Sequence, residues 1–211
     1  MTTKSFSAPT SRPQMTSASF GAQTPAERHR LFFALFPGAA VRSEISRAAE
    51  HLKSEQRPRG SWIAPERYHV TLHFLGESSE LRPDLLGHAS KAAAKVRSPA
   101  FEIAFDSAAS FHSPTPPWVL RCPEPAAGIR QLWRALDIAL TGEGMRTESG
   151  ASFTPHITVL RDADKALAPC AIKPIVWPVR DFVLIHSQLG RERRYTELGR
   201  WPLSDGARSA P

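Results

Sequence analysis

Two short segments of this 211-residue chain carry the same alternation of polar and apolar residues. In HVTLHFLGE, His69 and Thr71 are two positions apart, and in HITVLRD, His156 and Thr158 repeat that spacing. Successive side chains of a β-strand point to opposite faces of its sheet, so each His and Thr pair shares one face. The repeat therefore predicts two similar lobes, each with one strand that presents a histidine and a threonine.

The apolar residues of the two segments indicate which face is buried. Val70, Leu72 and Phe74 are expected to pack on a core in the first segment, as are the residues at the corresponding positions of the second. By the same parity His73 would share the face of His69, and we interpret it as a packed or solvated histidine without a catalytic role. An antiparallel strand with a solvated outer face would explain one such segment, but two copies favour a shared function.

Composition excludes several classes of protein. The longest apolar runs, such as LFFALF at 31–36, are too short to cross a bilayer, so no membrane association is expected. Cys122 and Cys170 are too few for a disulfide framework and lack the spacing of metal ligands, which indicates idle thiols in a reducing cytoplasm. The formal net charge of +7 favours an anionic partner, and nucleic acid is the commonest one.

The chain divides into one ordered region and two tails. Residues 1–26 are rich in Ser, Thr, Pro and Ala and contain no acidic residue, which predicts a disordered tail; a transit peptide is the alternative. Residues 27–203 are expected to form the domain, and 204–211 a flexible tail. Strands are predicted at 31–36, 68–76, 101–105, 118–122 and from His156, with a closing hairpin around Gly190. Helices are predicted after Pro37–Gly38, over 81–96 and over 129–140.

Four segments in this order resemble one family: RLFFALF, HVTLHFLGE, FTPHITVLRD and RYTELGRWPL. They are similar to the bacterial RNA 2′,3′-cyclic phosphodiesterases, also called 2′-5′ RNA ligases, of the two-histidine phosphoesterase superfamily. The resemblance runs from about Arg30 to Leu203. It implies an α+β, bilobal fold in which two pseudo-symmetric antiparallel sheets face each other across a central groove, with helices outside.

The resemblance also implies the site and its chemistry. His69 would donate a proton to the leaving 3′ oxygen of a cyclic phosphate and His156 would take a proton from water, giving a 2′-phosphate. Thr71 and Thr158 would bind the phosphate. The residue types suit this chemistry, because imidazole is available in both protonation states near neutral pH and hydroxyls can donate to phosphate oxygens. The two motifs are nearly symmetric, so the residues alone leave open which histidine is the acid.

Other residues have weaker claims to a role. Phe32 shares the face of Arg30 on its strand, where it would either stack on an RNA base or belong to the core. Arg161 follows the second motif and would either help to neutralise phosphate or lie on the surface. The run RERR at 191–194 is interpreted as a solvated turn, with contact to a longer RNA as the alternative.

Two other classes of function stay open. A module that binds a nucleotide or RNA without turnover would keep the positive charge and the threonines. A metal site is disfavoured because no Cys or carboxylate stands at ligand spacing beside the histidines. We therefore expect an enzyme without a cofactor or metal that acts as a monomer on RNA or oligonucleotides ending in a 2′,3′-cyclic phosphate. Reversible 2′-5′ ligation at the same site is expected as a further activity.

Overall fold

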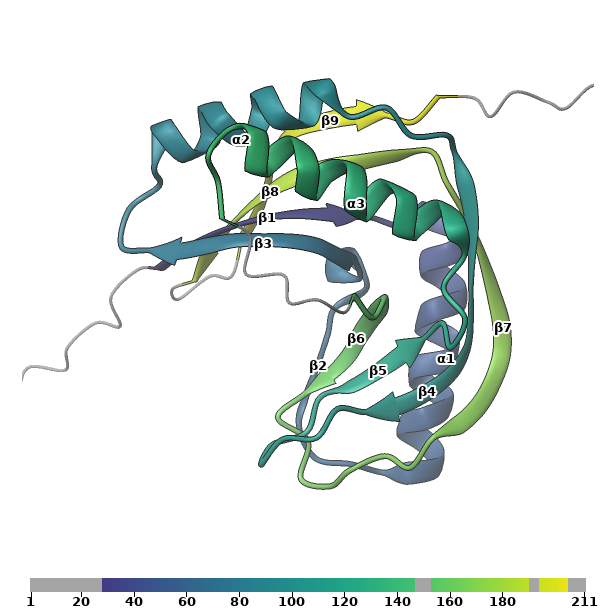
Figure 1. Ribbon diagram of the computed structural model, residues 1–211. Coiled ribbons are helices and arrows are strands. Elements are labelled where there is room, and N and C mark those ends of the chain that lie inside the picture. The colour runs from purple at the N-terminus through teal and green to yellow at the C-terminus, as the bar shows by residue number, and fades with distance from the viewer. Residues whose placement is uncertain (1–27, 147–152, 190–193, 205–211) are drawn as a thin grey trace, which may run out of the picture.

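The strands of this chain form two antiparallel sheets (Figure 1). The computed structural model describes residues 28–146, 153–189 and 194–204. The predicted tails lie outside these residues, except that Ser204 pairs with Pro99 in an isolated bridge. Gly190, the predicted centre of the closing hairpin, also lies outside them. The α+β fold with two antiparallel sheets is confirmed.

Sheet A combines strands from the two ends of the chain, and sheet B is formed by the strands between them. Sheet A has the order β3 (Val70–Ser78), β1 (Arg28–Leu35), β8 (Asp181–Leu189) and β9 (Arg194–Pro202). Sheet B has the order β2 (Ser61–Trp62), β6 (His156–Arg161), β5 (Trp118–Arg121), β4 (Phe101–Ser110) and β7 (Cys170–Val179). The two similar halves expected from the sequence therefore do not correspond to the two sheets, because β8 and β9 close sheet A and β2 extends sheet B.

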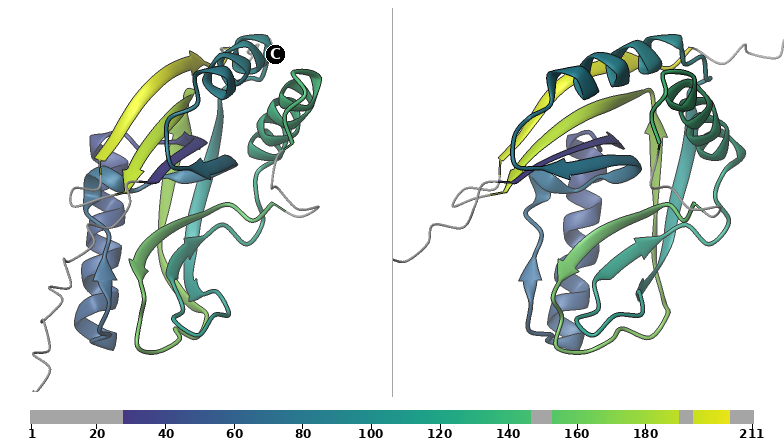
Figure 2. Two further views of the ribbon diagram at one scale, coloured as in Figure 1. Left: turned by 90° about the vertical axis from the view of Figure 1, so that its left-hand side faces the viewer. Right: turned by 60° about the vertical axis from the view of Figure 1, so that its left-hand side comes forward.

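The described residues form three α-helices, which lie outside the sheets as predicted (Figure 2). Helix α1 (Ala39–Gln56) follows β1 of sheet A but packs against β7 of sheet B. Helices α2 (Pro83–Lys95) and α3 (Ala127–Gly142) pack on each other and on sheet A, where α3 contacts β3 and α2 contacts β9. Within the described part of the chain, no helix is long and apolar enough to span a membrane.

Helical periodicity explains how α3 is held. Its apolar residues recur every three or four positions, and Ile129, Leu132, Leu136 and Leu140 are all fully buried. These side chains join one core that also contains buried residues of both sheets. The core covers the outer face of each sheet, which is the face toward the helices. The opposite face, called the inner face below, carries the His and Thr of the two motifs.

Strand β7 is an element that the sequence pattern did not predict. It contains Pro174 and Pro178, which lack the N–H group that a strand ladder needs. The strand lies at the edge of sheet B and pairs with β4 alone, so the missing donors remove no hydrogen bond from a central strand. The two prolines therefore made this long edge strand difficult to predict from the sequence pattern.

A bulge in β3 overturns the predicted parity of two residues. In the β1–β3 ladder His73 pairs with Phe33 and Thr71 with Ala34, so Leu72 is an extra residue. After the bulge the faces exchange: His73 lies on the outer face with 0% exposure, while Phe74 packs with Phe32 on the inner face. The expected inner position of His73 and the expected core position of Phe74 are wrong, although His73 is indeed a packed histidine.

Gly128 allows α3 to approach β4 closely. A Cβ atom at this position would lie 2.5 Å from Cγ of Phe101, which is too close. We expect Gly128→Ala to lower the free energy of unfolding by about 1–3 kcal/mol, because either the helix or the ring must move. Gly87→Ala in α2 meets nothing within 4 Å and should instead stabilise by roughly 0.5–1 kcal/mol. Urea denaturation measures both changes, and equal effects of the two substitutions would contradict the close approach.

Candidate active site

The two histidines of the motifs are held in the same way. His69 directly precedes β3 and His156 is the first residue of β6. The Nδ1 atom of His69 lies 2.7 Å from the carbonyl oxygen of Arg67, and Nδ1 of His156 lies 2.8 Å from that of Thr154. In both cases the partner is the carbonyl two residues earlier in the chain. The repeat in the sequence is therefore also a repeat of hydrogen bonding.

These two hydrogen bonds determine the tautomer of each ring. A backbone carbonyl can only accept a hydrogen bond, so Nδ1 of each imidazole must carry the proton and donate it. The Nε2 atom is then the one that gains or loses a proton. Each ring thus has one nitrogen committed to the backbone and one available for acid or base chemistry.

The alternation predicted for the four motif residues is confirmed. Within each motif the His and Thr are partly accessible, whereas the intervening Val70 and Ile157 are fully buried on the outer face. Neither Thr71 nor Thr158 donates its hydroxyl proton to another residue within the described part of the chain. Both hydroxyls are therefore available to a bound group on the inner face.

Aromatic rings surround His69. Phe36 lies nearly parallel to the imidazole with centroids 5.4 Å apart, and Phe32 lies 5.3 Å away at a tilt of 34°. Tyr195 of β9 meets the same ring edge-on at 5.7 Å. Phe111 is perpendicular to the His156 ring at 4.8 Å. These contacts restrict the orientation of both imidazoles and exclude water from one side of each.

The environment of the two histidines disfavours their charged forms. Burial lowers the pKa of His69 to about 4, and the positive charges of Arg161, His156 and Arg67 act in the same direction against the opposing hydrogen bond to the Arg67 carbonyl. Burial and the charge of Arg121 lower the pKa of His156 below its usual value. Because His156 and Arg161 of sheet B act on His69 beside sheet A, the two motifs lie close together. Strands β3 and β6 are in contact.

The structure brings together the predicted residues and adds others. Arg161 acts on His69 from across the two sheets, and Phe32 packs on the His69 ring with 6% of its surface exposed. The sequence pattern did not indicate Arg67, Arg121 or Tyr195 as members of the site. Arg121 pairs with His156 across the β5–β6 ladder, and this register cannot be read from composition or periodicity.

Arg67 and Tyr195 interact with each other at the edge of the site. The guanidinium lies over the Tyr195 ring at 4.7 Å from its centroid and donates a hydrogen bond of 3.2 Å to the hydroxyl. The sequence offered one signal for Arg67, since it stands two residues before His69. Arg67 thereby links sheet A at β9 to the short 3-10 turn η1 (Pro65–Arg67) that leads into the first motif.

The remaining predicted features are the two cysteines, the RERR run and the disfavoured metal site. Both cysteines are free, and burial raises the pKa of the Cys122 thiol. The RERR run lies outside the described residues except for Arg194, which begins β9. Among the residues that the structure describes, no three His, Cys, Asp or Glu side chains come together as ligands for a metal ion.

Comparison with known sequences places this geometry in context. Residues 41–191 match the model of the 2′-5′ RNA ligase superfamily. The RNA 2′,3′-cyclic phosphodiesterase of Escherichia coli K12 is 35% identical over 181 residues, which are 84% of this chain and 98% of the relative. The protein of the same name from Thermus thermophilus is 32% identical over 172 residues, covering 76% of this chain and 82% of the relative.

Solved structures agree with the sequence comparison. E. coli LigT in its apo form matches with a TM-score of 0.69 and 32% identity, covering 85% of this chain and 99% of that protein. LigT complexed with 3′-AMP matches with a TM-score of 0.67 and 31% identity over similar shares. A structure from T. thermophilus matches with a TM-score of 0.65 and 26% identity, covering 84% of this chain and 99% of that protein.

Proton NMR can test the depressed pKa values directly. We expect His69 to titrate near pH 4 and His156 below 6.5 in the protein without ligand. Arg161→Gln should raise the pKa of His69, because a repulsive cation is removed. Titration of His69 near 6.5 in the wild type would show that its ring is solvated.

The lowered pKa of His69 makes the free energy of unfolding depend on pH. A folded-state pKa below the unfolded value means that the unfolded chain binds more protons, so His69 contributes stability above about pH 6.5 that is lost as the pH falls toward 4. Urea unfolding at pH 7 and pH 5 should show a smaller pH-dependent loss in His69→Asn than in the wild type.

Proposed function

This chain belongs to the 2′-5′ RNA ligase superfamily, and we propose that it hydrolyses RNA ends carrying a 2′,3′-cyclic phosphate to a 2′-phosphomonoester and a free 3′-hydroxyl. The names of the relatives from E. coli and T. thermophilus support this activity. The observation that carries it is the pair of histidines from two sheets, each with Nδ1 bound to its own backbone and Nε2 available.

The reaction needs one proton acceptor and one proton donor. A water oxygen attacks phosphorus while Nε2 of His156 takes a proton from that water, and the bond between phosphorus and the 3′ oxygen breaks. Nε2 of protonated His69 gives its proton to the departing 3′ oxygen. The 2′ oxygen stays bonded to phosphorus, so the product is a 2′-phosphate. The two rings end in exchanged protonation states and return to the starting state through solvent.

Other residues of the inner faces bind the phosphate in this proposal. The hydroxyls of Thr71 and Thr158 donate to the non-bridging oxygens, and Arg161 offsets the negative charge that develops on them. Phe32 supports the site by holding the His69 ring, because the two rings are in contact and only 6% of the Phe32 surface is exposed. A base of the RNA would then reach only the exposed edge of this aromatic cluster.

The same arrangement serves 2′-5′ ligation when an RNA 5′-hydroxyl replaces the attacking water. The proton transfers and the leaving group are unchanged, so we propose that both reactions use one site. Water at about 55 M favours hydrolysis unless a second RNA end is held near phosphorus. The chemistry proposed here requires no metal, and a monomer in the cytoplasm remains the expectation.

Substitution of the histidines tests the assignment. His69→Ala and His156→Ala should each lower kcat for an oligonucleotide with a 2′,3′-cyclic phosphate by at least about 10²-fold, because each removes one proton transfer. Thr71→Val and Thr158→Val should cost roughly 10 to 10³-fold, since each removes one donor to the phosphate. Circular dichroism serves as the control for folding. Full activity of either alanine variant would overturn the acid-base assignment, and a wild type that binds the oligonucleotide without turnover would leave RNA binding as the function.

The pH dependence of the rate gives a second test. Because one ring must be neutral and the other protonated, kcat/KM should follow a bell-shaped curve whose limbs belong to the pair. Both pKa values lie below 6.5 in the free protein, so the maximum of kcat/KM should also lie below pH 6.5. In the bound complex the phosphate charge raises both pKa values, and the kcat maximum should move to higher pH.

A chelator completes this test. EDTA should leave the rate unchanged, because the proposed proton transfers involve only the two histidines. Loss of activity with EDTA and its recovery on adding a divalent cation would overturn the metal-independent mechanism. A rate that rises to a plateau at high pH would also contradict it, since a single base or a metal-bound hydroxide gives that profile.

A further inference from the structure

A buried polar contact lies directly behind the first motif. His73 follows Thr71 by two residues and is 0% exposed, although its side chain is polar. Its Nε2 atom lies 2.9 Å from the backbone carbonyl of Trp133 in α3, so Nε2 carries the proton and donates. The ring lies almost parallel to the Trp133 indole, at 16° with centroids 5.1 Å apart. Asp137, one helical turn further along α3, is 4.0 Å from Nδ1 of His73.

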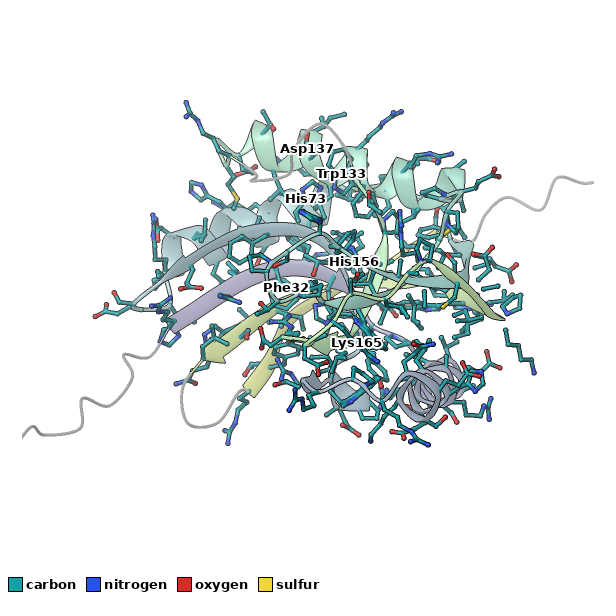
Figure 3. All side chains as sticks on the ribbon, turned by 90° about the horizontal axis from the view of Figure 1, so that it is seen from below. Phe32, His73, Trp133, Asp137, His156 and Lys165 are labelled. Carbon is teal, nitrogen blue, oxygen red and sulfur yellow. The ribbon has the colours of Figure 1, made fainter. Side chains whose placement is uncertain are left out.

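Trp133 also satisfies the backbone of the bulge in β3. Its indole Nε1–H donates to the carbonyl of Leu72 at 3.1 Å. Leu72 is the extra residue of the bulge and stands between Thr71 and His73. Two hydrogen bonds and one ring contact therefore attach the strand of the first motif to a single residue of α3. Figure 3 shows His73, Trp133 and Asp137 on the side of α3, with Phe32 and His156 nearer the middle of the molecule.

Trp133 also contacts the segment that leads into the second motif. The Phe153 ring lies parallel to the indole within 10°, with centroids 5.5 Å apart. Phe153 precedes His156 by three residues, and the carbonyl of Thr154 between them accepts the hydrogen bond of His156. The indole thus contacts residues that adjoin both motifs, although the motifs belong to different sheets.

We propose that Trp133 is a positioning residue that sets the spacing between His69 and Thr71 beside sheet A and His156 and Thr158 of sheet B. This inference rests on the proposed function, in which both histidines act on one phosphate. Proton transfers in a single step require reacting atoms at about 3 Å, and a displacement of about 1 Å can cost on the order of 10²-fold in rate. Trp133 touches no reacting atom, so its effect passes through β3 and through the segment that leads into β6.

Trp118 provides a matched control within the same chain. Its indole Nε1–H also donates to a backbone carbonyl, that of Lys165, at 2.9 Å. It is fully buried and packs edge-on against Trp62, and it belongs to the outer-face core without contacting either motif histidine. Trp118→Phe and Trp133→Phe each remove one indole hydrogen bond and keep an aromatic ring.

Kinetics on a cyclic-phosphate oligonucleotide separate positioning from stability. Trp133→Phe should lower kcat about tenfold with KM changed less than about threefold, because the groups that bind phosphate remain. Trp133→Leu, which loses the ring contacts as well, should lower kcat further. Trp118→Phe should lose a similar amount of thermal stability and keep kcat within about threefold. Equal kcat values for the two phenylalanine variants would overturn the inference.

A titration gives a readout that does not depend on turnover. The pKa of His69 is held down in part by His156 and Arg161, which come from the other sheet. When the two motifs move apart, the NMR-measured pKa of His69 should rise toward 6.5 in Trp133→Phe and stay unchanged in Trp118→Phe. An unchanged value in both variants would contradict the inference, even if the wild type proved inactive and the proposed function failed.

A second variant keeps the test decisive if Trp133→Phe folds poorly. Phe153→Leu removes the ring contact between Phe153 and the indole and leaves both hydrogen bonds of Trp133 in place, that of its indole and that of its backbone carbonyl. It should lower kcat and raise the pKa of His69 in the same direction as the tryptophan variant. If folded Phe153→Leu keeps both the wild-type kcat and the wild-type pKa of His69, the inference that Trp133 sets the spacing of the two motifs is wrong.

Discussion

The hydrogen bond from each histidine Nδ1 to the carbonyl two residues earlier determines what the site can do. It commits one ring nitrogen to the backbone and leaves Nε2 as the atom that exchanges protons. In each motif the accepting carbonyl belongs to the segment that leads to the histidine: Arg67 ends η1 before His69, and Thr154 lies before His156. Local backbone geometry, repeated on two sheets, thus produces two rings of the same tautomer with opposite proposed tasks.

Burial and positive charge disfavour the protonated forms of the two histidines, and an anionic ligand offsets this effect. In the free protein the rings are withdrawn from water and lie near Arg67, Arg121 and Arg161, so their protonated forms are disfavoured. A bound phosphate brings negative charge to the same place and favours the protonated forms again. Bound phosphate therefore increases the population of the protonated ring that the proposed donor requires, while the positive side chains that attract the substrate keep its pKa low.

The sequence predicted the parts of this site that depend on strand periodicity. His69, Thr71, His156 and Thr158 lie on the inner faces because apolar neighbours alternate with them. Periodicity failed where the backbone departs from regular pleating, so the Leu72 bulge moved His73 to the outer face. It also gave no prediction for β7, where Pro174 and Pro178 interrupt the strand pattern although an edge strand tolerates them. Arg121 could not be found at all, because its contact with His156 depends on the pairing of β5 with β6.

The path of the chain between the two sheets explains why one helix, α3, can couple the two motifs. Helix α3 lies between β5 and β6 of sheet B in the sequence, yet it packs on β3 of sheet A. The chain that leaves α3 must return to sheet B before it reaches His156, and Phe153 stacks on Trp133 at this return. A shift of α3 relative to β3 would therefore displace the start of β6 as well. The distance between the two histidines depends on packing outside the site, which the His-x-Thr pattern alone does not specify.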